Sequence, residues 1–158
     1  MFTGSDMPLP LFLLSSAILA LVLVQLVRID LREHRLPDRY TLPLIAIGLI
    51  TNALAQRALP TEAIWGSIVG YAVFWLIGAV YFRQRGQEGL GLGDAKLLSA
   101  AGAWVGILAL PWVVLLSALG GLGFALLSGH GRGQRLAFGP WLAGGLFLTW
   151  ITRWLFSG

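Results

Sequence analysis

The chain is a series of apolar runs, most of them near the length of a membrane-spanning helix, joined by short polar segments. The first run, residues 10–29, would span about 30 Å as a helix, which matches the hydrocarbon core of a bilayer. Its arginines follow the run rather than precede it, which is not the pattern of a cleavable signal peptide. Charged residues make up only 11% of the chain, whereas soluble domains carry about 25%. We therefore predict an all-α, polytopic integral membrane protein with a single membrane-embedded domain over residues 1–158.

About six transmembrane helices are predicted. The runs cover approximately residues 10–29, 40–55, 63–82, 95–110, 112–127 and 136–150. The division between the fourth and fifth runs depends on Pro111, which we expect to end a helix. Gly66 with Gly70, and Gly102 with Gly106, have the GxxxG spacing that lets membrane helices approach closely. Ordinary tolerance of glycine in membrane helices explains this spacing equally well.

The basic residues are distributed unevenly between the two sides of a six-span topology. Nine fall on one side, namely Arg28, Arg32, Arg35, Arg39, Arg83, Arg85, Lys96, Arg132 and Arg135, while Arg57 and Arg153 fall on the other. By the positive-inside rule the nine face the cytoplasm and both chain ends face outward. Because these cations occupy the gaps between apolar runs, they indicate a lipid bilayer and not a nucleic acid as the partner.

Asp94 stands where a glycine-rich polar segment enters the fourth apolar run. One interpretation is a helix N-cap, because aspartate is favoured there and suits the positive end of the helix dipole. The alternating Gly89, Gly91 and Gly93 favour a second interpretation, since they allow close approach of an extended peptide. We therefore predict an active-site or substrate-binding loop that contains Gly91, Gly93, Asp94 and Lys96.

Asp30 lies at the carboxyl-terminal end of the first run, where the helix dipole disfavours a negative charge. An interfacial ion pair with Arg28 or Arg32 is one explanation, and a functional carboxylate is the other. Asp38 follows Pro37 and precedes a helix, so we interpret it as a turn or cap residue.

A site that joins Asp30 and Asp94 would have a defined chemistry. Two like charges cannot both ionise cheaply, so one carboxyl keeps a proton. The carboxylate can then activate a water while the protonated partner polarises an amide carbonyl, which is peptide hydrolysis without a metal or covalent intermediate. The helix dipole favours Asp94 as the base and Asp30 as the acid.

Other residue types add little chemistry. His34 and His130 lack metal-ligand spacing, and the absence of cysteine excludes disulfides and thiolate ligands. We expect no cofactor and no metal. Four tryptophans near the predicted span ends, Trp104, Trp112, Trp150 and Trp154, are expected to be interfacial anchors.

The chain resembles the type IV prepilin peptidases, a family of GxGD membrane aspartyl proteases. Three segments carry the resemblance in the family's order: Asp30 with Leu36-Pro37-Asp38 and Thr41-Leu42-Pro43, then Gly91-Leu92-Gly93-Asp94-Ala95-Lys96-Leu97-Leu98, then Phe138-Gly139-Pro140. The resemblance implies a six-helix endopeptidase of the bacterial inner membrane. It would cleave the short basic leader of prepilins or pseudopilins at the cytoplasmic face, with Asp30 and Asp94 as its catalytic pair.

Full-length members of that family carry an N-terminal cytoplasmic loop with paired cysteines, which is linked to methylation of the new N-terminus. Here the first run leads directly to Asp30 and cysteine is absent. The resemblance therefore implies a short form that cleaves without methyl transfer, zinc or S-adenosylmethionine.

Two other function classes stay open. A small proton- or cation-coupled transporter would use both aspartates as relays, although the near absence of charge inside the predicted spans counts against it. A non-catalytic assembly factor of a pilus or secretion complex would tolerate asparagine at both positions. The identity of the pilin substrate and the oligomeric state do not follow from the sequence.

Overall fold

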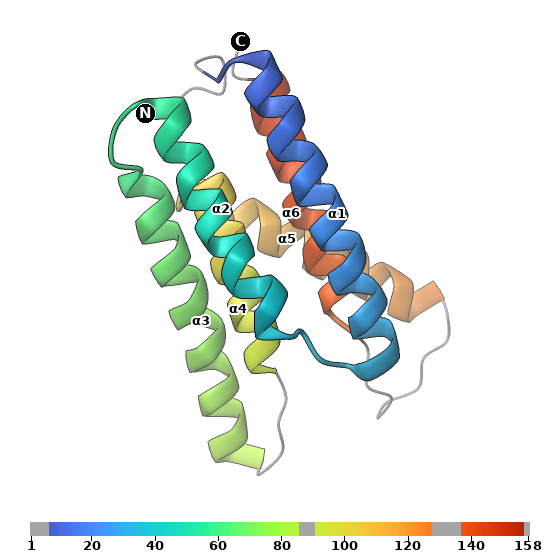
Figure 1. Cartoon of the computed structure of the whole chain (residues 1–158). Coiled ribbons are helices and arrows are strands. Elements are labelled where there is room, and N and C mark those ends of the chain that lie inside the picture. Colours follow the sequence, from blue (N-terminus) through green and yellow to red (C-terminus); the bar gives the residue numbers. More distant parts are fainter. Residues whose placement is uncertain (1–6, 86–90, 128–136, 157–158) are drawn as a thin grey trace.

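The computed structural model describes residues 7–85, 91–127 and 137–156, and the regular structure in these ranges is entirely helical (Figure 1). The helices are α1 (Leu9–Glu33), α2 (Asp38–Gln56), α3 (Thr61–Arg85), α4 (Leu92–Val105), α5 (Leu110–Leu127) and α6 (Gly139–Leu155). Within the described residues, α1, α3 and α5 are long and apolar enough to cross a membrane. The prediction of an all-α, polytopic membrane protein is confirmed.

Helix α4 forms the centre of the bundle. It contacts α2, α3, α5 and α6, and every residue from Leu97 to Val105 is buried. Most of these residues are small, which lets four neighbouring helices surround a single short one. In Figure 1, α1 and α6 lie side by side, and α6 also contacts α4. The core therefore runs along α4. The two ends of this helix are where polar groups can contact it.

Glycines bring α3 and α4 into backbone contact. A Cβ atom on Gly66 would lie 2.6 Å from the carbonyl oxygen of Gly102, and one on Gly70 would lie 2.6 Å from that of Leu98. The predicted GxxxG contact is thus confirmed for Gly66, Gly70 and Gly102. Gly106 has another role, because it follows α4 with a φ of +78° and ends the helix.

The position of the break between α4 and α5 was predicted wrongly. The chain leaves α4 at Gly106, and Pro111 is the second residue of α5. A proline in the first turn loses no helical hydrogen bond, and its fixed φ suits a helix start. Pro111 therefore begins a helix and does not end one.

Two of the tryptophans are core residues and not interfacial anchors. Trp104 and Trp150 are buried with their rings edge-to-face at 5.2 Å between centroids. The indole N–H of Trp104 donates to the carbonyl oxygen of Leu44 at 2.9 Å, and that of Trp150 donates to Ser16 Oγ at 2.9 Å. Satisfied indole donors permit this burial. Trp112 is 61% exposed, as an anchor would be.

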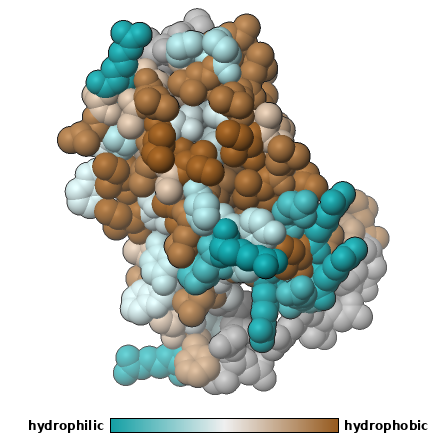
Figure 2. Space-filling view, viewed as in Figure 1, coloured by the Kyte–Doolittle hydropathy of each residue, from teal (hydrophilic) through white to brown (hydrophobic). Residues whose placement is uncertain are grey.

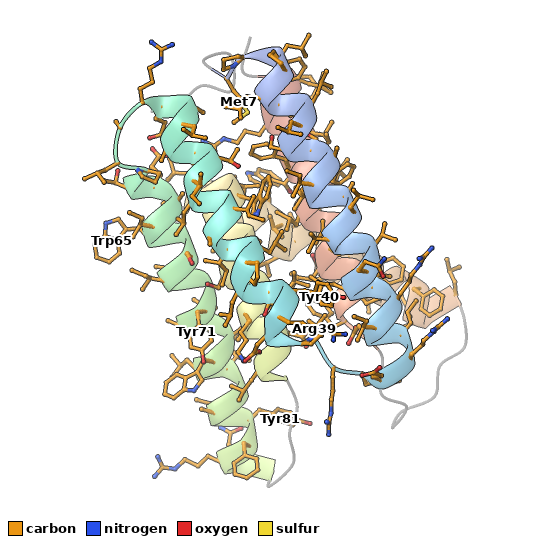
Figure 3. All side chains as sticks on the ribbon, in the orientation of Figure 1. Met7, Arg39, Tyr40, Trp65, Tyr71 and Tyr81 are labelled. Carbon is orange, nitrogen blue, oxygen red and sulfur yellow. The ribbon has the colours of Figure 1, made fainter. Side chains whose placement is uncertain are left out.

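The bundle has a strongly polar end where α1 leads into α2. Figure 2 shows hydrophobic side chains across the middle of the molecule and hydrophilic ones gathered at that end. Arg39 and Tyr40 lie there at the start of α2, whereas Trp65 and Met7 lie toward the opposite end (Figure 3). The guanidinium carbon of Arg39 sits 5.0 Å from the centroid of the Tyr40 ring.

Candidate active site

A cleft of about 730 Å³ opens at this polar end, between the α1–α2 link and the start of α4. It is lined by Asp30, Glu33, His34, Arg35, Leu36, Pro37, Gly91, Leu92, Gly93, Asp94 and Lys96. All five residues that the sequence analysis assigned to the site are among them. The structure thus brings Asp30 and Asp94 to one cleft from two helices that are distant in sequence.

Asp30 occupies the last turn of α1 and is only 6% exposed. Its Oδ2 accepts a hydrogen bond of 3.1 Å from the backbone N–H of Gly139, the first residue of α6. A Cβ atom on Gly139 would overlap this carboxylate and lie 2.9 Å from its Cγ. The amino-terminal end of α6 therefore faces Asp30, and the absence of a side chain at Gly139 makes the approach possible.

The interfacial ion pair considered for Asp30 is not present. Asp30, Arg28 and Arg32 all lie within the described ranges, where the ion pairs are Lys96–Asp38 and Arg153–Glu62. Asp30 is thus held by a backbone donor and not by a neighbouring arginine.

Asp94 is the third residue of α4, outside the three candidate membrane spans, and Gly91 occupies the N-cap position. The N-cap interpretation of Asp94 is therefore wrong. Burial raises the pKa of Asp94 from its ordinary value of 3.8 to about 6, and the negative charge of Asp30 contributes in the same direction. A hydrogen bond from the Gly91 backbone partly offsets this rise. Asp94 thus holds its proton more tightly than an exposed aspartate does.

Lys96 lines the same cleft, but its ammonium group is bound elsewhere. Its Nζ lies 2.5 Å from Oδ1 of Asp38, the first residue of α2. The sequence analysis placed Lys96 beside Asp94 and treated Asp38 as a local turn residue. The structure instead joins Lys96 to Asp38 across two helices.

The glycines before Asp94 have different surroundings. Gly91 is exposed and extended, with φ −72° and ψ 147°. A Cβ atom on Gly93 would lie 2.9 Å from Cβ of Leu36, so the α1–α2 link packs directly on the first turn of α4. Gly89 and His130 lie outside the described residues. Within the described ranges, no three acidic or histidine side chains gather as metal ligands would.

Sequence reasoning missed Gly139 as the partner of Asp30. The signal available was the Phe138-Gly139-Pro140 segment, in which a glycine precedes a proline at a helix start. That pattern locates the end of a helix, but it does not indicate which side chain the end faces.

Two neighbouring acidic groups of this kind can perform general acid and base catalysis. Neither Asp30 nor Asp94, both of which the structure describes, takes part in an ion pair. The mutual repulsion of two carboxylates in one cleft favours a state that holds one proton between them. One group can then accept a proton while the other donates one.

Comparison with known sequences identifies the family. The sequence model of the type IV leader peptidase family matches residues 9–126, a range that includes both aspartates. The chain belongs to the type IV leader peptidase family. No solved structure gives a significant match.

Individual relatives agree with this assignment. The chain is 43% identical over 153 residues to "Prepilin leader peptidase/N-methyltransferase" of Aeromonas salmonicida (strain A449), an alignment that covers 91% of this chain and 53% of that protein. A protein of the same name in Escherichia coli (strain K12) is 42% identical over 132 residues, which is 78% of this chain and 59% of that protein. The Neisseria gonorrhoeae relative is 43% identical over 127 residues, 80% of this chain and 44% of that protein.

The chain spans about half the length of the curated relatives it matches. Together, the family and the helices α1, α3 and α5 show a multi-pass bacterial membrane protein.

Proposed function

We propose that this protein is an aspartyl endopeptidase that removes the N-terminal leader of type IV prepilins or pseudopilins, with Asp30 and Asp94 as its catalytic residues. The observation that carries the proposal is the cleft that both side chains line, α1 supplying one and α4 the other. The relatives' printed name, prepilin leader peptidase, supports the choice of substrate. The description of the matching family, type IV leader peptidase, agrees with this choice.

The surroundings of the two carboxyl groups suggest their roles. The N–H of Gly139 stabilises a negative charge on Asp30, and that charge, after the larger effect of burial, raises the pKa of Asp94. Asp30 would then be the base and Asp94 the acid, the reverse of the assignment drawn from the dipole of α4 alone. The helix-dipole argument no longer separates the two residues, because the amino-terminal end of a second helix, α6, lies against Asp30.

The proposed reaction balances with these two groups and one water. Asp30 takes a proton from the water while the water oxygen attacks the scissile carbonyl carbon. Asp94 gives its proton to the carbonyl oxygen. When the tetrahedral intermediate collapses, the carbon–nitrogen bond breaks and Asp30 passes its proton to the leaving amine. The proton on the former carbonyl oxygen returns to Asp94, which restores the starting state.

We further propose that the cleft faces the cytoplasm from the bacterial inner membrane. The segment beside it, from the last turn of α1 to the first turn of α2, carries Arg32, Arg35 and Arg39, whereas the link after α2 carries the single cation Arg57. This distribution follows the positive-inside rule. Labelling of an introduced cysteine at Arg35 by a membrane-impermeant maleimide, in intact cells and in inverted vesicles, tests the orientation.

The activity is tested with detergent-purified protein and a prepilin-like peptide, with mass spectrometry locating the cut. We expect Asp30→Asn and Asp94→Asn each to lower kcat by at least about a thousandfold, because each removes one half of the proton transfer. Glu62→Gln is the matched control, since it makes the same carboxylate-to-amide change at the first turn of α3, away from the cleft. Equal processing by both aspartate variants would refute the proposal and favour a non-catalytic assembly factor.

The relatives' names include a second activity, N-methyl transfer. Its absence from this chain stays a prediction. Mass spectrometry of the cleaved peptide after incubation with S-adenosylmethionine checks it, because methylation would add about 14 Da to the new N-terminus.

A further inference from the structure

We propose that the ion pair between Lys96 and Asp38 is a clamp that sets the relative position of the two aspartates, so that both members are positioning residues. This inference rests on the proposed peptidase function. The clamp is defined by the 2.5 Å contact of Lys96 Nζ with Asp38 Oδ1. It connects the first turn of α2 to the early part of α4, across 58 positions of sequence.

The direction of the Lys96 side chain separates its role from that of Asp94. Residues two positions apart on an α-helix point about 200° away from each other. Lys96 therefore leaves α4 on a different side from Asp94 and reaches α2. Its ammonium group binds Asp38, and the influences on the pKa of Asp94 are burial, Asp30 and Gly91.

The clamp closes a ring of contacts around the cleft. The α1–α2 link runs from the last turn of α1, which holds Asp30, through Leu36 to Asp38. Leu36 is only 8% exposed and packs against Gly93, one residue before Asp94. The link is thus fixed to α4 at two neighbouring points, the Leu36–Gly93 contact and the clamp. Without the clamp, the link and the last turn of α1 could shift relative to Asp94.

The exposure of the two side chains indicates that the clamp acts on geometry more than on stability. Lys96 is 25% exposed and Asp38 is 57% exposed, and exposed ion pairs of this kind contribute little to folding. Catalysis is far more sensitive, since a misplacement of about 1 Å can lower a rate by about a hundredfold. Loss of the clamp should therefore appear in kcat while the protein stays folded.

The first experiment measures kcat and KM for a prepilin-like peptide with Lys96→Met and Asp38→Asn. We expect each substitution to lower kcat by about tenfold with less than about a twofold change in KM. Arg39→Met is the matched control, because it removes a neighbouring exposed cation that stacks on Tyr40. A rise in KM with Lys96→Met alone would overturn the proposal, because it would mean that Lys96 binds substrate directly.

Restoring the ion pair tests whether the contact itself matters. We expect Lys96→Arg to keep kcat within about threefold of the parent, because a guanidinium can still reach Asp38. The exchanged pair, Asp38→Lys with Lys96→Asp, should recover most of the activity that either substitution alone loses. If the exchanged pair and Lys96→Arg are both as impaired as Lys96→Met in folded protein, the clamp does not position the site.

A distance measurement tests the clamp without catalysis. Since the chain has no cysteine, Leu42→Cys on α2 and Leu92→Cys on α4 provide two unique sites for spin labels, and both leucines are exposed. We expect one narrow distance distribution by pulsed electron paramagnetic resonance in the parent, and a broader one with Lys96→Met. An unchanged distribution would overturn the clamp. If no prepilin-like peptide is cleaved by the parent, the proposed function fails while this measurement still decides the clamp.

Discussion

Charged side chains lie near both ends of α4: a cation meets a carboxylate at one end, and two carboxyl groups line one cleft at the other. At its carboxyl-terminal end, Arg153 donates to the Val105 carbonyl oxygen and lies 3.8 Å from Glu62. At its amino-terminal end, Asp94 faces Asp30 across the cleft, and neither is in an ion pair within the described residues. The first arrangement satisfies a helix terminus and stabilises the bundle. The second destabilises the fold locally, which is typical of a catalytic site.

The comparison teaches that charge alone does not mark function in this bundle. The half-buried cation Arg153 meets a helix carbonyl and a carboxylate and supports packing, whereas Asp30 and Asp94 lack such a partner in the described part of the chain and, under the proposed function, serve chemistry. If this distinction is right, substitutions at the two ends should divide cleanly between effects on activity and effects on stability.

Gly139→Ala should have the largest effect, on activity at the cleft end. Its new Cβ would overlap the Asp30 carboxylate and displace it from the N–H donor, so we expect kcat/KM to fall by at least about a hundredfold. Gly144→Ala on the same helix is the control, because no atom lies within 4 Å of a Cβ there. The measurement is peptide cleavage by protein shown to be folded by scanning fluorimetry. Equal activity of the two variants would mean that Asp30 does not need this contact.

Arg153→Met should come next, with its effect on stability. It leaves the Val105 carbonyl oxygen and Glu62 without their cation, which we expect to cost about 2–3 kcal/mol. The melting temperature should fall by several degrees, while kcat of the folded fraction stays unchanged. Arg57→Met, at an exposed position on the same end of the bundle, should leave the melting temperature within about one degree. A specific loss of kcat with Arg153→Met would erase the contrast between the two ends.

Asn52→Ala should produce a smaller loss of stability at the same end. The Asn52 amide donates to the carbonyl oxygens of Gly48, Ala103 and Trp104 at 2.9–3.1 Å. Removing a buried donor that serves several acceptors should cost about 1–2 kcal/mol. Chemical denaturation in detergent measures it. An unchanged midpoint would show that other donors or water replace the amide.

Asp94→Asn should change stability with the opposite sign. Because the pKa of Asp94 is raised from 3.8 to about 6 in the folded protein, folding takes up a proton between these values and stability falls as the pH rises through that window. At pH 7.5 we expect Asp94→Asn to be more stable than the parent by up to about 3 kcal/mol. At pH 4 the difference should nearly vanish. Melting curves at both pH values decide it, and a destabilised variant at pH 7.5 would contradict the prediction.

The sequence predicted the helices well because they are local features. Each apolar run became a helix, and the glycine spacing at Gly66 and Gly102 predicted the tightest helix contact. The placement of Asp30 and Asp94 in one cleft was also predicted, because each ends or begins an apolar run on the same side of the predicted topology. Local pattern fails where a choice depends on tertiary contacts. Hydropathy cannot tell an interfacial Trp104 from a buried one, and a proline marks a helix boundary without saying which helix it belongs to.

The partners of the site residues could not be predicted for the same reason. Asp38 has a sufficient local explanation as a turn residue, so nothing in its neighbourhood points to Lys96. Gly139 stands 109 positions from Asp30, and only the packing of α6 against α1 brings its N–H to the carboxylate. Both contacts are tertiary, and the second one holds the Asp30 carboxylate.

That last separation in sequence has a consequence for biosynthesis. A ribosome delivers α1 and α4 long before α6, so a nascent chain contains both acidic groups while the donor that secures one of them does not yet exist. The contact between Asp30 and Gly139 therefore forms only after α6 has been made. Under the proposed function, we expect a nascent chain that lacks α6 to be inactive, because the Asp30 carboxylate has not yet met its Gly139 donor.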